Sequence, residues 1–281
     1  MMVDGIENVS PNASGFAHGV GLFETCALVE SKAAFFDEHW ERLAASAASL
    51  GLPFEYDKTE VVFALCEFLE QATNADDSAL KLTLYEDAPG HTKLIWNLRA
   101  KRKLSPEVRT RLNLSSQQLN EHAELTGHKT LNYWPNRRGL ERATQAGVLD
   151  ALVLNTNGVL AECWASNVFI IKEGVAYTPP LDDGPLPGVV RRIIRQEALR
   201  NGIEMDECSI TLEDVSQAEA VFVTNSLIGI QEITQIELMN TRTWSAAQTA
   251  HPIIEKLKAS YASALAKSIS MFGPRGEGAV R

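Results

Sequence analysis

The chain has 281 residues and a formal net charge of −10, because 36 acidic side chains outnumber 26 basic ones. Hydrophobic residues make up 45% and charged residues 22%, which is typical of globular proteins. The acidity argues against a duplex nucleic-acid binder, which needs a basic face. No stretch approaches the ~18 consecutive apolar residues of a membrane span, and the first residues do not resemble a signal peptide. We therefore expect a soluble, cytoplasmic enzyme with no nucleic-acid or membrane partner.

The first half of the chain predicts a mixture of strands and helices. In chain order these are a strand over 22–30, helices over 37–50 and 58–73, and strands over 79–86 and 92–100. Asp37 is expected to cap the first helix, and Gly51 and Pro53 to end it. The charged segment 101–109, which contains Pro106, is interpreted as a linker between domains.

The second half predicts more strands with fewer helices. The predicted elements are a strand over 111–116, a helix over 133–146, a hairpin over 150–162, a strand pair over 166–180, a helix within 184–199, a strand over 220–226 and a helix over 245–269. The hairpin prediction depends on Asn157-Gly158, a strong turn signal. The pattern indicates the α+β class. We expect a small N-terminal domain (1–103), a larger C-terminal domain (108–272) and a disordered tail (273–281).

Several well-known catalytic patterns are absent from the sequence. There is no Walker loop, no GxSxG elbow, no HExxH and no dinucleotide-binding GxGxxG. The six histidines lack metal-ligand spacing, so no metal site is predicted, and the four cysteines form no CxxC pair. What remains is a set of loops whose residues suit phosphate or cofactor binding, namely those containing Lys129, Glu162, Gly188 and Ser226.

Taken singly, each of these residues also has an ordinary structural interpretation. Lys129 can be a solvated charge, Glu162 a surface carboxylate at a strand end, and Gly188 a turn residue. The loop that ends at Ser226 can be a capping loop, and the spacing of Arg42 alone fits an exposed helix face. The order in which the segments occur is therefore what favours a functional interpretation.

Five motifs occur in one order: GFAHGVGLFET, EHWERLAASA, HKTLNYWPN, LVLNTNGVLAECWASNVFI with TPPLDDGPLPGVVRR, and VFVTNS. This order resembles the class IV aminotransferases, the fold-type IV enzymes that use pyridoxal 5′-phosphate (PLP). The group includes branched-chain aminotransferases, D-amino acid aminotransferases and aminodeoxychorismate lyases. The resemblance covers residues 15–234 and implies a two-domain fold-type IV enzyme with a small N-terminal α/β domain and a larger C-terminal domain. It also implies a homodimer.

The resemblance assigns three residues to the reactive part of the cofactor. Lys129 matches the Schiff-base lysine, whose amine can also move a proton between substrate and cofactor. Glu162 matches the acidic partner of the pyridine nitrogen. A carboxylate there keeps the ring protonated, so the ring can act as an electron sink. Tyr133, four residues after Lys129, matches a tyrosine that hydrogen-bonds the phenolic oxygen of the cofactor, although a buried core tyrosine is the alternative.

The same resemblance assigns a second group of residues to the phosphate of the cofactor. Arg42 matches the arginine that pairs with the phosphate, for which its planar fork is suited. The loop ending at Gly188 opens a helix at which Val189 and Val190 would offer backbone N–H groups. The late VTNS loop would complete the phosphate site with Asn225 and Ser226.

Substrate recognition is less well defined by the resemblance. His18 and Phe23 match positions that line the substrate pocket in relatives, although Phe23 can equally be a core residue. Relatives often place an arginine after the strand that contains Tyr85 to hold a substrate carboxylate; here a short EDAPGH loop follows. His91 in that loop can take part of this role or be a solvated histidine.

Three functions remain open from the sequence. The first is an aminotransferase that moves an amino group from an amino acid to a 2-oxo acid through Lys129. The second is a lyase that converts aminodeoxychorismate to 4-aminobenzoate and pyruvate with the same cofactor. The third is a PLP-binding homologue without catalysis, which the missing carboxylate arginine would explain and the presence of Lys129, Glu162 and Arg42 argues against.

Overall fold

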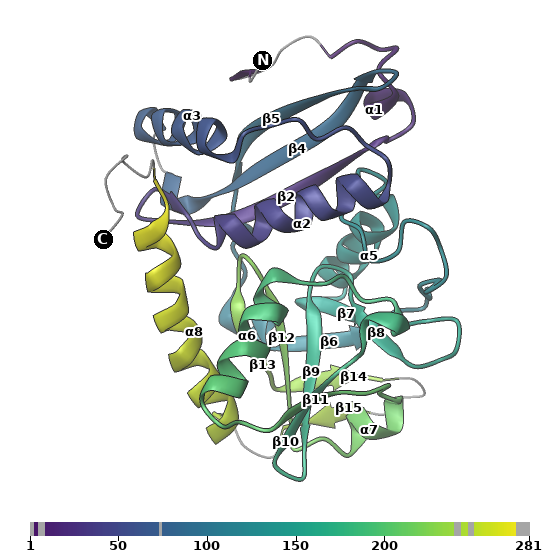
Figure 1. Cartoon of the computed structure of the whole chain (residues 1–281). Helices are drawn as coiled ribbons and strands as arrows, with labels where there is room; N and C mark the ends of the chain where they lie inside the picture. The colour runs from purple at the N-terminus through teal and green to yellow at the C-terminus, as the bar shows by residue number, and fades with distance from the viewer. Residues whose placement is uncertain (1–2, 5–8, 73–74, 239–242, 247–249, 274–281) are drawn as a thin grey trace. The chain divides into compact units, whose positions relative to one another are not determined.

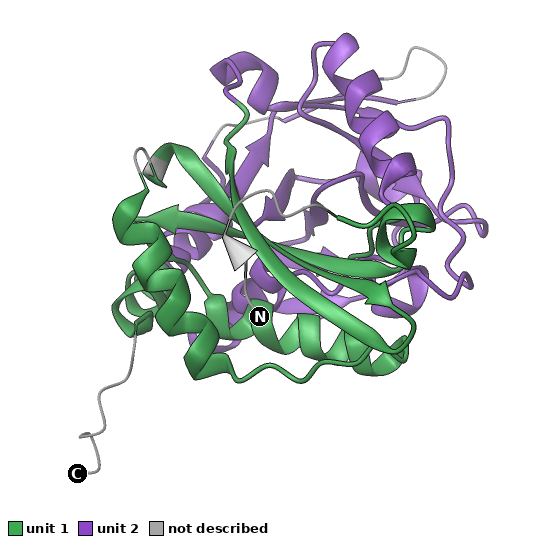
Figure 2. Ribbon diagram, turned by 90° about the horizontal axis from the view of Figure 1, so that it is seen from above, with its two compact units in different colours: residues 1–102, 129–132, 263–281 green, residues 103–128, 133–262 purple. Residues whose placement is uncertain are grey.

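A computed structural model describes residues 3–4, 9–72, 75–238, 243–246 and 250–273 of the chain. Figure 1 shows the elements in chain order. The chain divides into two compact units, coloured separately in Figure 2. Unit 1 comprises residues 1–102, 129–132 and 263–281; unit 2 comprises residues 103–128 and 133–262. No helix within the described ranges is both long and apolar enough to span a membrane.

These units differ in two places from the predicted domains 1–103 and 108–272. Residues 129–132 belong to unit 1, because the backbone of this segment pairs with a strand of that unit. Residues from Ser263 onward also belong to unit 1, where the ring of Phe272 packs against Phe36 with centroids 5.5 Å apart. Of the predicted disordered tail, residues 274–281 lie outside the described residues.

Unit 1 is built on a single sheet with two helices packed against one face. Its elements are β1 (Val3–Asp4), α1 (Ser14–Ala17), β2 (Gly21–Val29), β3 (Lys32–Ala33), α2 (Phe36–Ser49), α3 (Lys58–Gln71), a short 3₁₀ turn η1 (Ala75–Asp77), β4 (Ser78–Ala88) and β5 (His91–Ala100). Within the described residues, the strand order is β1-β5-β4-β2-β3, with β1 parallel to β5 and the other pairs antiparallel.

The core of unit 1 follows from hydrophobic periodicity. Leu43 and Ala47 are four residues apart on α2, as are Leu65 and Leu69 on α3, so each helix presents one apolar face. These faces pack with alternate residues of β2 and β4, including Leu80 and Leu82. Asp57 caps α3, since its side chain accepts hydrogen bonds from the N–H groups of Thr59 and Glu60.

Unit 2 contains two sheets and the remaining helices. Its elements are α4 (Pro106–Arg109), β6 (Arg111–Leu114), α5 (Trp134–Gln145), β7 (Asp150–Leu154), β8 (Leu160–Cys163), β9 (Asn167–Lys172), β10 (Val175–Thr178), the 3₁₀ turn η2 (Leu181–Asp183), α6 (Val189–Arg200), β11 (Met205–Glu207), α7 (Leu212–Ser216), β12 (Ala220–Asn225), β13 (Gly229–Ile233), β14 (Gln235–Glu237), β15 (Thr243–Ser245) and the first part of α8 (Pro252–Met271). The sheet orders, within the described residues, are β11-β10-β9-β12-β13 and β15-β14-β6-β7-β8.

The strand β9 shows how these sheets are layered. Val168 and Ile170 face a core shared with the other sheet, whereas Phe169 and Ile171 face a second core that includes α6 and the start of α8. This alternation is the period of two expected of a strand. A third cluster places Trp164 with β7 and α5. The sheets are therefore buried on both faces, which explains their nearly continuous apolar sequences. The predicted α+β class is confirmed.

Two predicted helix starts are wrong. The cap of α2 is Phe35, in a left-handed conformation with φ 52°, and Asp37 lies in the first turn. The helix starts earlier than predicted because Phe36 packs into the core. The last helix starts at Pro252, not at 245, because residues 243–245 pair with β14 as strand β15. Trp244 of β15 is buried and donates Nε1–H to Ala218 O at 3.0 Å.

Candidate active site

In unit 1, the backbone beside Lys129 is fixed against β2. Phe23 N donates to Lys129 O at 2.8 Å, and Leu131 N donates to Gly21 O at 2.9 Å. A Cβ at Gly21 would come within 2.4 Å of Leu84 O, so only glycine permits this close packing. The Nζ of Lys129 lies 4.4 Å from the centroid of the buried Phe23 ring, within cation–π range. The structure thus brings together two of the predicted site residues, Lys129 and Phe23.

Arg42 belongs to a buried network that the sequence did not reveal. Its Nε and Nη2 donate to the two carboxylate oxygens of Glu24, at 2.8 and 2.7 Å, so the pair is bidentate. Glu24 Oε2 lies 2.6 Å from His39 Nδ1. Burial alone would raise the pKa of Glu24, but the charge of Arg42 and contact with His39 outweigh it and hold the pKa well below its usual range.

His39 completes this network as a neutral donor. Burial lowers the pKa of His39, and the charges of Arg42 and Lys129 lower it further, against the opposing effect of Glu24. The neutral ring donates its Nδ1–H, since an ionised carboxylate can only accept. One sequence signal was available, because His39 and Arg42 are three residues apart on one helix.

The remaining predicted residues of unit 1 lie in exposed positions. His18 follows α1 as its C-cap residue, and His91 is the first residue of β5, just after the β4–β5 turn. Both residues are solvent-exposed. Their assignment to substrate stays a prediction.

In unit 2, Glu162 lies on β8 with one oxygen held by two donors. Its Oε2 accepts from Leu186 N at 3.0 Å and from Asn167 Nδ2 at 3.3 Å. Tyr133 is the residue before α5 and is half-buried. The orientation of the Glu162 carboxylate is therefore set by β9 and by the loop that precedes α6.

The start of α6 has the features of an anion site. Gly188 is the N-cap and offers no side chain to the first N–H groups of the helix, which include those of Val189 and Val190 and have no acceptor within the helix itself. A Cβ at Gly188 would lie 1.9 Å from Asn167 Oδ1, which requires glycine here. Both valine side chains are buried, so only their backbone is offered to a ligand.

Asn225 holds its own loop in place. Its Oδ1 accepts from Leu227 N and Ile228 N, at 2.9 and 3.0 Å, and its Nδ2 donates to Ala165 O and Ser166 Oγ, both at 3.1 Å. The side chain thus orders the turn that contains Ser226.

Asp150 lies beneath this loop and was not identified from the sequence. It is 1% exposed and accepts from Ala165 N and Ser166 Oγ, each at 3.1 Å, and from Ala151 N at 2.8 Å. Burial raises its pKa to about 6, against the effect of these donors. Asp150, Ser166 and Asn225 therefore form one polar chain below the VTNS loop.

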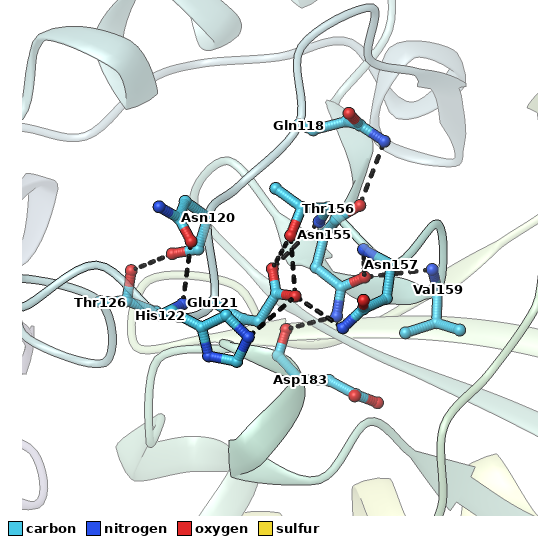
Figure 3. A network of polar contacts seen from close by, with 10 residues as sticks. All are labelled: Gln118, Asn120, Glu121, His122, Thr126, Asn155, Thr156, Asn157, Val159 and Asp183. Atoms are coloured by element: carbon cyan, nitrogen blue, oxygen red, sulfur yellow. Dashed lines mark hydrogen bonds and ion pairs between the residues drawn. The ribbon is translucent and has the colours of Figure 1, made fainter.

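The segment that leads to Lys129 has its own polar contacts, shown in Figure 3. Glu121 accepts from Thr156 N at 3.0 Å, from Thr156 Oγ1 at 2.8 Å and from Asn157 Nδ2 at 2.6 Å. Asn155 Nδ2 in turn donates to Asp183 O at 3.2 Å. Glu121 thus ties the segment before Lys129 to the predicted Asn157-Gly158 turn between β7 and β8.

Comparison with known proteins identifies the family. Residues 21–236 match the family described as amino-transferase class IV. The chain is 31% identical to a D-alanine aminotransferase of Listeria innocua, over 79% of this chain and 80% of the relative. It is 28% identical to the aminodeoxychorismate lyase of Bacillus subtilis, over 86% of each. A solved structure of a putative 4-amino-4-deoxychorismate lyase from Legionella pneumophila has a TM-score of 0.81 at 28% identity, covering 94% of this chain and 98% of that one. The chain belongs to the class IV aminotransferase family.

Class IV aminotransferases use PLP as their cofactor. The residues of unit 2 fit this group, since they offer a carboxylate for a pyridine nitrogen and helix N–H groups for a phosphate. Thr224 supports this fit. Its Oγ1 is buried near the end of β12 and has no hydrogen-bond partner among the described residues.

Proposed function

We propose that the protein is a PLP-dependent aminotransferase that moves an amino group from an amino acid to a 2-oxo acid, with Lys129 as the Schiff-base lysine. The observation that carries this proposal is the fixing of the Lys129 backbone against β2, with its amine over the Phe23 ring. A reactive amine gains from such positioning, because the group is held near its site of action before substrate binds. Membership of the class IV aminotransferase family supports PLP chemistry at this amine.

Each assigned residue then has a defined task. When bound, PLP supplies an aldehyde that links to amines and a pyridine ring that withdraws electrons. Glu162 accepts a hydrogen bond from the pyridine nitrogen and Tyr133 donates one to the phenolic oxygen. Lys129 Nζ would take up the proton from the substrate Cα and release it again during the transfer of the amino group.

The phosphate is assigned to Arg42, to the N–H groups of Val189 and Val190, and to Ser226. Glu24 accepts hydrogen bonds from Nε and Nη2 of Arg42, which fixes the orientation of the guanidinium plane. Asn225 serves indirectly, because its amide orders the turn that contains Ser226.

A single-donor assay tests the proposal. Purified holoenzyme is incubated with individual D- and L-amino acids, and the 2-oxo acid formed is measured with and without an added 2-oxo acid acceptor. An aminotransferase gives one equivalent per site without the acceptor and continuous turnover with it. Absence of any product across the donors would refute the proposal.

Lys81 provides a matched control for the lysine assignment. Its Nζ also lies over the Phe23 ring, 4.9 Å from the centroid. Lys129→Ala should abolish turnover and the visible absorbance of the lysine-linked cofactor, whereas Lys81→Ala should retain both. Turnover that survives Lys129→Ala would show that another residue is the Schiff-base lysine.

The alternative function is an aminodeoxychorismate lyase. It is supported by the relatives from Bacillus subtilis and Legionella pneumophila, which match over most of their length. A lyase releases pyruvate and 4-aminobenzoate from aminodeoxychorismate continuously without any 2-oxo acid acceptor. The acceptor dependence of product formation therefore distinguishes the two functions in one assay.

A further inference from the structure

Asn167 lies where the elements of the unit 2 site converge. It is the first residue of β9, is 6% exposed and pairs with Thr224 of the antiparallel strand β12. Strand alternation places Asn167 on the same face as Phe169, which packs with α6. The side chain therefore sits at the end of the sheet where α6 begins.

The amide of Asn167 contacts two separate parts of this site. Its Nδ2 donates to Glu162 Oε2 at 3.3 Å on one side and to Leu186 O at 2.8 Å on the other. Leu186 N donates to the same Glu162 oxygen at 3.0 Å, which closes a ring of hydrogen bonds between β8, β9 and the loop before α6.

The other end of the amide controls the start of α6. Asn167 Oδ1 lies so close to Gly188 that a Cβ there would approach it to 1.9 Å. The position of Gly188 therefore depends on the Asn167 side chain, and the N–H groups of Val189 and Val190 follow directly in the chain. One buried amide thus touches both the carboxylate and the helix start.

We propose that Asn167 is a positioning residue that fixes the Glu162 carboxylate relative to the N-terminus of α6. The inference rests on the proposed function, in which Glu162 serves the pyridine nitrogen and α6 the phosphate. The pyridine nitrogen and the phosphate are covalently joined within one small molecule, so Glu162 and the start of α6 must lie at a separation that this molecule can span. Asn167 sets that separation before the cofactor binds, and it does so without touching the reacting atoms.

Cofactor affinity and a double-mutant cycle test this role. Apo protein is titrated with PLP, and the dissociation constant is measured for wild type, Asn167→Ala, Asn167→Asp, Glu162→Gln and Asn167→Ala/Glu162→Gln. Asn167→Asp keeps the size of the side chain and removes both N–H donors. We expect each Asn167 variant to bind PLP about tenfold more weakly, as for the loss of a hydrogen bond to a charged group.

Two further measurements separate positioning from general stability. Thr178→Val is the matched control, because Thr178 is 1% exposed and donates Oγ1–H to Val168 O at 2.9 Å, elsewhere in the same sheet. It should lower the thermal stability of the apo protein without changing PLP affinity. The absorbance of bound cofactor is also followed against pH, because the hydrogen bond at the pyridine nitrogen affects it. The Asn167 variants should shift this profile in the direction that Glu162→Gln does.

The cycle decides the outcome. If Asn167 acts through Glu162, the loss of PLP affinity in the double variant is clearly smaller than the sum of the two single losses. Strictly additive losses, or an Asn167→Ala variant with wild-type affinity and pH profile beside an affected Glu162→Gln, would overturn the positioning role alone. An unaffected Glu162→Gln would instead overturn the assignment of Glu162 in the proposed function, and with it this inference.

Discussion

The carboxylate of Glu24 lies 2.6 Å from the Nδ1 of His39, and both side chains are almost completely buried. The native state holds Glu24 ionised and His39 neutral, because burial lowers the pKa of His39 and contact with Arg42 and His39 keeps that of Glu24 low. Protonation of either group therefore opposes folding. This pair makes the stability of unit 1 sensitive to acid.

The first prediction is a loss of stability below neutral pH. A histidine whose pKa is lowered on folding stabilises the native state above its unfolded pKa, and this contribution is lost as pH falls from about 6.5. Glu24 adds a similar loss as pH falls below about 4.5. Urea unfolding between pH 8 and pH 5 should show a flatter pH dependence for His39→Gln than for wild type. His91→Gln, at an exposed position, should keep the wild-type slope; equal slopes for all three would contradict the prediction.

The second prediction concerns the partner of Glu24. Arg42→Met leaves a buried carboxylate without its cation and should lower the free energy of unfolding by about 3–5 kcal/mol at pH 7. Arg137→Met, on the exposed surface of α5, should change it by less than about 0.5 kcal/mol. Adding Glu24→Gln to Arg42→Met should recover part of the loss. If the double variant is less stable than Arg42→Met, the unpaired carboxylate is not the cause.

Local patterns predicted the helices and strands well where one face is apolar. Helix 58–73 is observed as Lys58–Gln71, and the strand 92–100 as His91–Ala100. The predicted start of the last helix is wrong because that boundary depends on pairing with a strand distant in the sequence. Residues 243–245 form a strand by pairing with β14, which in turn pairs in parallel with β6, with Gln235 opposite Arg111. No local sequence pattern encodes these pairings.

For the candidate site, the sequence indicated which residue types to expect and not how they are held. Lys129 and Glu162 came from the order of motifs. The residues that hold Arg42 and Glu162 in place did not, because Glu24 and His39 meet only when β2 packs beside α2, and Asn167 reaches Leu186 O only when the loop before α6 packs on β9. A buried polar contact requires three-dimensional proximity, which spacing along the chain does not reveal.

The third prediction tests the network of Figure 3. The side chain of Glu121 is 1% exposed, and its own backbone N–H together with the Thr156 donors lowers its pKa. Glu121→Gln replaces one accepting oxygen by a donor that faces other donors, so the bonds to Thr156 and Asn157 cannot all be kept. Amide hydrogen exchange over residues 120–128 should become several-fold faster, because local opening limits exchange.

Glu124 supplies the control for this experiment. It lies three residues further along the same segment and is exposed. Glu124→Gln removes an equal charge and should leave the exchange rates of residues 120–128 unchanged. If both variants accelerate exchange equally, the change in charge, and not the bonds of Glu121, is responsible.

The fourth prediction reverses the usual effect of glycine in a helix. Replacing a helical glycine by alanine ordinarily stabilises by about 1 kcal/mol. In α5, a Cβ at Gly139 would lie 2.3 Å from the indole of Trp164, which is 7% exposed and packs with Ala151 and Val153. The rigid indole cannot move aside within this cluster, so Gly139→Ala should destabilise by about 1–3 kcal/mol in urea unfolding. In the double variant Gly139→Ala/Trp164→Leu the clash is removed, and the loss should be smaller than the sum of the two single losses. A more stable Gly139→Ala protein would show that Trp164 repacks freely.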